Sequence, residues 1–180
     1  CHKNAPIAGV VYVPATKVIY KGVKGLGPPV REEDDELGYD SYRSAFCSEF
    51  DERDKGLKIV TSASHNSPET DAFLARFVEP QVSTFGSSLK LAMIAEGRAH
   101  VYPRMAPTME WDTCAAHAIV ECAGGEVLEY PSGKPLVYNK PDLQNPSFVA
   151  YGKRRQRDAN SAKKDISVGG GAFLGFSAIS

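Results

Sequence analysis

The sequence has no long apolar run and no excess of charge of either sign. No window approaches the roughly 18 uninterrupted apolar residues of a membrane-spanning helix, and residues 1–20 lack the layout of a secretory signal. The 21 basic and 22 acidic side chains leave a formal charge of -1, so no overall positive field favours a nucleic-acid partner. These absences indicate a soluble, cytoplasmic protein in which any anion site is local.

Cysteine is also scarce. Four cysteines at irregular spacing are too few for a disulfide scaffold in a domain of this size, and reduced thiols are the simpler interpretation. A zinc site at Cys114, His117 and Cys122 is disfavoured, because Cys122 lies about 80° around a helix from Cys114 and no fourth ligand follows nearby. With 180 residues, of which 42% are hydrophobic, the chain suits one compact domain.

The N-terminal part of the sequence predicts a hairpin. Residues 7–13 read as an apolar strand closed by a proline, and a second short strand follows at 18–20. Because two strands alone are marginal in water, we expect sheet partners in a portion of the chain upstream of Cys1. Residues 21–56 are punctuated by Gly and Pro and include the acidic run 32–36, which predicts a solvated connector without a metal role.

From residue 57 onward, strands alternate with helices. Strands are expected at 57–61, 82–85, 99–102, 126–130 and 148–151, and helices at 68–78, 88–96 and 113–123. Ser67 is placed as the N-cap of the first helix, and a Gly-Gly pair ends the third. This alternation predicts an α/β layer with helices packed on a largely parallel or mixed sheet. The basic and glycine-rich residues 152–180 predict a disordered tail.

Three strand-to-helix junctions, at 61–65, 85–90 and 107–112, could share one crevice. In α/β sheets such junctions lie at the carboxyl ends of strands, where ligands usually bind. In the first junction, Ser62 and Ser64 offer hydroxyl donors. His65 there could contact a phosphate or a base, with an ordinary structural role as the alternative.

The second junction suits an anion. Gly86 allows close approach of the backbone, the first helical amides lack internal partners, and Ser87 and Ser88 can add hydrogen bonds. Lys90 supplies a full positive charge one turn into the helix. The alternative is that a serine merely caps this helix and that Lys90 is a solvated surface residue.

Asp112 comes directly before the helix expected at 113–123. Asp is a favoured N-cap residue, which is the ordinary interpretation. A carboxylate beside a phosphate site has a second use, because Mg²⁺ typically takes one or two carboxylates together with phosphate oxygens. Only its pairing with the anion-binding turn makes Asp112 a candidate metal ligand.

Several strings of residues resemble the C-terminal half of the inositol monophosphatase superfamily. They are Gly86-Ser87-Ser88-Leu89-Lys90, Ala95-Glu96-Gly97, Val101-Tyr102-Pro103-Arg104, Pro107 to Thr113, and Ala123-Gly124-Gly125. The Ser-x-Ser-His turn at 62–65, the Gly-Ser-Ser-x-Lys turn and the Tyr-Pro-Arg segment more narrowly resemble the bacterial 3'(2'),5'-bisphosphate nucleotidases. The similarity runs from about Pro6 to Tyr151.

The resemblance implies an α/β fold, the C-terminal part of the layered αβαβα sugar-phosphatase fold. A mixed sheet flanked by helices is expected, together with a hairpin left from an N-terminal antiparallel sheet. The implied units are a remnant sheet domain and connector at 1–56, a phosphatase domain at 57–151, and the tail at 152–180.

The resemblance also implies a Mg²⁺-dependent phosphomonoesterase that removes the 3'-phosphate of 3'-phosphoadenosine 5'-phosphate to give AMP, a step of sulfur assimilation. A phosphorylated nucleotide is then the partner, and the location is cytoplasmic or peripheral to the inner membrane. Asp112 would ligate the metal close to the substrate. The implied substrate-binding residues are Ser62, Ser64, His65, Gly86, Ser87, Ser88, Lys90, Arg104 and Asp112.

Two features depart from the family pattern. Ala63 stands where the family usually has Arg, and the family's other metal ligands, a Glu and an Asp-Pro-Leu/Ile-Asp-Gly-Thr motif, would precede residue 7. We therefore expect the 180-residue chain alone to be inactive or nearly so. An inositol phosphate substrate and a truncated anion-binding product without turnover are the alternatives, and the oligomeric state is open.

Overall fold

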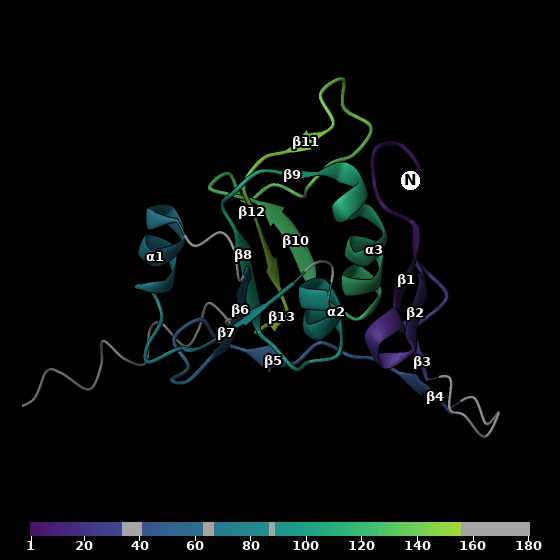
Figure 1. Ribbon diagram of the computed structural model, residues 1–180, viewed down its shortest axis with the longest axis horizontal. Helices are drawn as coiled ribbons and strands as arrows, with labels where there is room; N and C mark the ends of the chain where they lie inside the picture. The colour runs from purple at the N-terminus through teal and green to yellow at the C-terminus, as the bar shows by residue number, and fades with distance from the viewer. Residues whose placement is uncertain (34–40, 63–66, 87–88, 156–180) are drawn as a thin grey trace, which may run out of the picture.

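A computed structural model describes residues 1–33, 41–62, 67–86 and 89–155 (Figure 1). Two sheets enclose two helices. A four-stranded sheet of order β1-β2-β3-β4 lies on one side, and a five-stranded sheet of order β10-β12-β8-β6-β7 lies on the other. Helices α2 (Leu89–Ala95) and α3 (Cys114–Cys122) run between them, and α1 (Pro68–Leu74) covers the outer face of the larger sheet. This confirms the α/β class and the layered arrangement.

The smaller sheet is antiparallel throughout. Its strands are β1 (Ala8–Val13), β2 (Val18–Val23), β3 (Val30–Glu33) and β4 (Ser41–Ser44). The prediction of an unstructured connector at 21–56 was wrong, because β3, β4 and β5 (Glu49–Phe50) lie within it. The hairpin thus finds partners downstream, on the β2 side.

Polar pairing explains why β3 escaped prediction. Arg31 on β3 contacts Glu96 at the end of α2 at 2.5 Å, and the Tyr20 hydroxyl donates to the same carboxylate at 2.7 Å. Lys21 on β2 pairs across the strands with Glu32, one of the acidic residues assigned to a solvated loop. A strand held by charge pairs and hydrogen bonds has no apolar alternation for sequence analysis to detect.

The larger sheet is mixed, as predicted. Strands β6 (Lys58–Ser62), β7 (Gln81–Phe85) and β8 (Val101–Arg104) are parallel, whereas β12 (Phe148–Tyr151) and β10 (Glu126–Glu129) run antiparallel to their neighbours. Short pieces complete the chain: η1 (Pro14–Thr16), η2 (Glu110–Asp112), β9 (Thr108–Met109) paired with β11 (Gln144–Asn145), and β13 (Lys153–Arg154).

The helices end earlier than predicted, but the predicted N-cap of α1 and the glycine stop after α3 are confirmed. The Ser67 side chain accepts a hydrogen bond from the Thr70 amide at 3.3 Å, as an N-cap does. Gly124, with φ +89°, supplies the left-handed residue after α3. The tail expected from residue 152 starts with β13, which pairs in parallel with β5; residues 156–180 lie outside the described part of the chain.

Two apolar clusters form the core. The larger cluster joins both sheets through α2 and α3 and includes Val11, Tyr20, Ile94, Ile119 and Phe148. The smaller cluster lies between the five-stranded sheet and α1 and centres on Phe73. In the described part of the chain, no helix has the length and apolar character needed to cross a bilayer.

The contact between β1 and α3 is the tightest place in the larger cluster. A Cβ at Gly9 would lie 1.9 Å from the Ala115 carbonyl oxygen, so only glycine allows this approach of strand and helix.

Replacing Gly9 with Ala tests this packing. We expect Gly9→Ala to lower the free energy of unfolding by about 2–3 kcal/mol, measured by urea denaturation, because β1 must separate from α3. Val10→Ala is the matched control, since Val10 is 64% exposed on the opposite face of β1, and it should cost less than about 1 kcal/mol. Unchanged stability of Gly9→Ala would contradict the close approach.

Candidate functional site

A cavity of about 540 Å³ opens where β6 and β8 end. Strand β1, the first turn of α2, η2 and the start of α3 contribute the remaining walls. Its polar and aromatic lining includes Ser62, Lys90, Tyr102, Arg104, Trp111 and Asp112. Its volume lies in the range of small-molecule sites. Four residues predicted from separate stretches of sequence, Ser62, Lys90, Arg104 and Asp112, thus line one cavity.

The other predicted site residues either lie outside the described part of the chain or do not line this cavity. Ser64, His65, Ser87 and Ser88 lie outside the described residues. Gly86 directly follows β7 but is not among the cavity-lining residues, and a Cβ built on it would meet no described atom within 4 Å. The grouping of the Ser62–His65 and Gly86–Lys90 turns therefore rests on Ser62 and Lys90.

Lys90 is buried rather than solvated, which overturns the surface alternative. Its side chain is 2% exposed, its Nζ donates to the Phe85 carbonyl oxygen at 2.9 Å, and the ammonium lies 5.2 Å from the centre of the Tyr102 ring. Burial, with a smaller contribution from the nearby charge of Arg104, lowers the pKa of Lys90 to about 8. An anion bound in the cavity would stabilise a buried cation that lies so close to another.

Arg104, the last residue of β8, is a second cation on the wall of the cavity. Its Nη2 donates to the Pro107 carbonyl oxygen at 3.2 Å, while its buried Nε has no hydrogen-bond partner among the described residues. Leaving a buried guanidinium donor unpaired is costly, so a ligand oxygen that accepts from it would be favoured. Lys90 and Arg104 thus place two cationic side chains on the wall of one cavity.

Asp112 lies in η2 at the rim of the cavity. Its Oδ2 accepts a hydrogen bond from the Met109 amide at 3.0 Å, which closes the short helical turn. The N-cap of α3 is Thr113 rather than Asp112, so the simple N-cap interpretation of Asp112 was wrong. Asp112 is exposed and lines the same cavity as the two cations.

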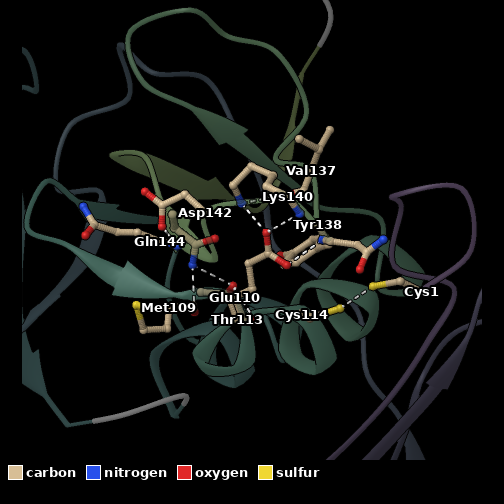
Figure 2. Close-up of polar contacts among 12 residues, drawn as sticks. Cys1, Met109, Glu110, Thr113, Cys114, Val137, Tyr138, Lys140, Asp142 and Gln144 are labelled. Carbon is tan, nitrogen blue, oxygen red and sulfur yellow. Dashed lines mark hydrogen bonds and ion pairs between the residues drawn. The ribbon is translucent and has the colours of Figure 1, made fainter.

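A buried carboxylate that sequence analysis did not single out holds η2 in place. Glu110 accepts hydrogen bonds from the backbone amides of Asn139 at 2.5 Å and Lys140 at 3.1 Å, and also from the Lys140 ammonium (Figure 2). Burial alone would raise the pKa of Glu110, but these donors outweigh it and lower the pKa. Asn145 adds a second tie through Nδ2, which donates to the Met109 carbonyl oxygen at 2.9 Å.

The described residues do not form a complete metal site. Within the described ranges there is no group of three or more His, Cys, Asp or Glu side chains that could hold an ion, and Asp112 is the carboxylate on the cavity wall. His117, which sequence analysis disfavoured as a zinc ligand, shares a 2.8 Å hydrogen bond with the Tyr138 hydroxyl inside the core. One carboxylate provides a single ligand, whereas a two-metal site needs several.

The motifs and the fold agree with comparisons against known proteins. The family model described as "Inositol monophosphatase family" matches residues 1–164. The chain belongs to the inositol monophosphatase family. This confirms the family inferred from the order and spacing of the motifs.

Within the family, the chain can be compared with individual relatives by sequence identity and by superposition. The 3'(2'),5'-bisphosphate nucleotidase CysQ of Escherichia coli K12 is 37% identical over 144 residues, covering 79% of this chain and 54% of the relative. The crystal structure of CysQ from Bacteroides thetaiotaomicron superposes with a TM-score of 0.71 at 38% identity, covering 84% of this chain and 60% of that one. An inositol monophosphatase from Anabaena gives a TM-score of 0.61 at 25% identity, covering 83% and 55%. The chain spans about half the length of the curated nucleotidases it matches.

The lowered pKa of Lys90 can be measured directly. We expect the ¹³Cε signal of Lys90 to titrate with a midpoint near pH 8, so that the ammonium is present at pH 7 and is lost as the pH rises through about 8. Arg104→Gln should move this midpoint upward by removing the neighbouring positive charge. Arg98→Gln, an exposed arginine beyond the other end of α2, is the control and should leave it unchanged. A midpoint at the ordinary value of 10.5 in the parent chain would contradict the buried position of Lys90.

Proposed function

We propose that this chain carries the substrate-binding part of a Mg²⁺-dependent phosphomonoesterase that converts 3'-phosphoadenosine 5'-phosphate to AMP. The observation that carries the proposal is the convergence of Lys90, Arg104 and Asp112 on one cavity of about 540 Å³. As part of the same proposal, the enzyme is cytoplasmic and acts in sulfur assimilation, and residues 57–151 are its phosphatase portion.

The cavity assigns separate tasks to these side chains. Lys90, fixed by the Phe85 carbonyl oxygen and the Tyr102 ring, places its charge against a phosphate group. Arg104 can donate a hydrogen bond to a second phosphate oxygen from its Nε, which has no partner within the described ranges. Ser62 at the end of β6 offers a hydroxyl to the same ligand, and the Met109 amide holds Asp112 in a fixed orientation.

Asp112 is proposed as one of several magnesium ligands. Because the described residues place one carboxylate at the cavity, we assign to this chain the binding and orientation of phosphate and no metal-dependent chemical step. We therefore propose that the 180-residue chain by itself turns over slowly or not at all.

The substrate is proposed to be a nucleotide rather than an inositol phosphate. The curated relatives at 37% identity are named bisphosphate nucleotidases, whereas the inositol monophosphatase structure is 25% identical. An inositol phosphate is the runner-up within the same reaction class. A protein that binds anions without turnover is the second candidate, favoured by a cavity with two cations and a single carboxylate.

Binding and turnover can be separated with the chain itself. We expect calorimetry to show that it binds 3'-phosphoadenosine 5'-phosphate more tightly than inositol 1-phosphate, with no phosphate release above background in Mg²⁺. Lys90→Met should weaken nucleotide binding by about 10–100-fold, because a charged hydrogen bond to phosphate is lost. Lys134→Met removes an exposed lysine after β10 and is the matched control. Equal affinity of the Lys90 variant would contradict the assigned cavity.

The role of Asp112 is tested in a version extended upstream to include the family's remaining acidic motifs. Asp112→Asn keeps the size of the side chain but removes its charge, and we expect phosphate release to fall by at least about 100-fold. Asp142→Asn is the control, since Asp142 is exposed and accepts a local bond from the Gln144 amide at 2.9 Å. Unchanged turnover in Asp112→Asn would reject the proposed ligand.

A further inference from the structure

Two cysteines far apart in the sequence meet beside the site. The sulfur atoms of Cys1 and Cys114 lie 2.8 Å apart and point toward each other (Figure 2). Cys1 comes from the N-terminal segment and is exposed, whereas Cys114 is the half-buried first residue of α3. A disulfide bond is about 2.05 Å long, so the two sulfurs need to approach by only about 0.8 Å to bond.

Backbone contacts hold the N-terminal segment in this position. The Tyr138 amide donates to the Asn4 carbonyl oxygen at 3.0 Å, and His2 and Ala5 exchange two backbone hydrogen bonds at 2.9 and 3.0 Å. Cys114 is held by the packing of α3 between the two sheets. The two sulfurs therefore lie close together because hydrogen bonds and packing in the folded chain hold both segments in place.

A small oxidant can reach the pair. Cys1 and Cys114 both line a second cavity of about 510 Å³, whose other walls include Glu110, Trp111 and Tyr138. Among their lining residues, this cavity and the cavity that holds Lys90 and Arg104 share Trp111.

We propose that Cys1 and Cys114 form a disulfide when the chain meets a low-molecular-weight disulfide such as oxidised glutathione. The exposed Cys1 thiolate attacks one glutathione sulfur, which breaks the glutathione disulfide and releases one glutathione thiolate. The Cys114 thiol then loses its proton and attacks the Cys1 sulfur, displacing the second glutathione. The two cysteines lose two electrons and two protons, and one oxidised glutathione becomes two reduced molecules.

The bond would fasten residues 1–5 to the start of α3, two positions after Asp112. It would also close a loop spanning residues 1–114, which restricts the unfolded chain strongly. The proposal concerns the folded chain alone and does not depend on the proposed phosphatase activity. In a reducing compartment both residues stay thiols, in agreement with the sequence interpretation.

Peptide mapping tests the proposal. The 180-residue chain is incubated with oxidised glutathione, alkylated, and digested with trypsin and a glutamate-specific protease, because Glu121 separates Cys114 from Cys122. We expect one predominant cross-link, Cys1–Cys114, and a rise of about 10 °C in the midpoint of thermal unfolding relative to the reduced chain.

Variants on the same helix provide the control. Cys122→Ser should leave the cross-link and the thermal shift unchanged, whereas Cys114→Ser should abolish both and leave a glutathione adduct on Cys1. Stable glutathione adducts in place of the cross-link in the parent chain, or cross-links scattered over all four cysteines, would overturn the proposal. A Cys1–Cys114 bond without a thermal shift would overturn its structural consequence.

Discussion

The packing of α3 between two sheets is the constraint on which the rest of the structure depends. The helix touches β1 so closely at Gly9 that no Cβ fits there, and its residues Ile119 and Val120 are buried in the larger apolar cluster. Because η2 leads directly into α3, this packing also fixes where Asp112 lies. The N-terminal hairpin is thus a wall of the anion cavity, as the contribution of Val11 shows.

Electrostatics give that cavity its chemical character. Lys90, which is 2% exposed, and Arg104, whose buried Nε has no hydrogen-bond partner among the described residues, line the same cavity, and the charge of Arg104 helps to lower the pKa of Lys90. Two backbone groups partly offset the cost of burying these groups, because the carbonyl oxygens of Phe85 and Pro107 accept hydrogen bonds from Lys90 and Arg104. A phosphate group would supply the negative charge that the described protein groups provide only partly.

Support for the site comes from residues to which the sequence assigned no role. Glu110 and Asn145 anchor η2 to the segment between β10 and β12; Glu110 lies in one of the strings that resemble the family, but the string does not show which contacts its side chain makes. Strand β3 is a similar case, since its ion pairs with β2 and α2 replace the apolar alternation by which strands are recognised. Such contacts join residues distant in sequence, and sequence patterns report only on neighbours.

The sequence by itself determined the alternation of strands and helices after residue 57, the cap at Ser67 and the family, because each depends on local order and spacing. Only the tertiary structure decided that Lys90 is buried, that Asp112 closes η2 instead of capping α3, and that Cys1 meets Cys114. Burial and long-range proximity arise when separate segments pack together, so no local pattern encodes them.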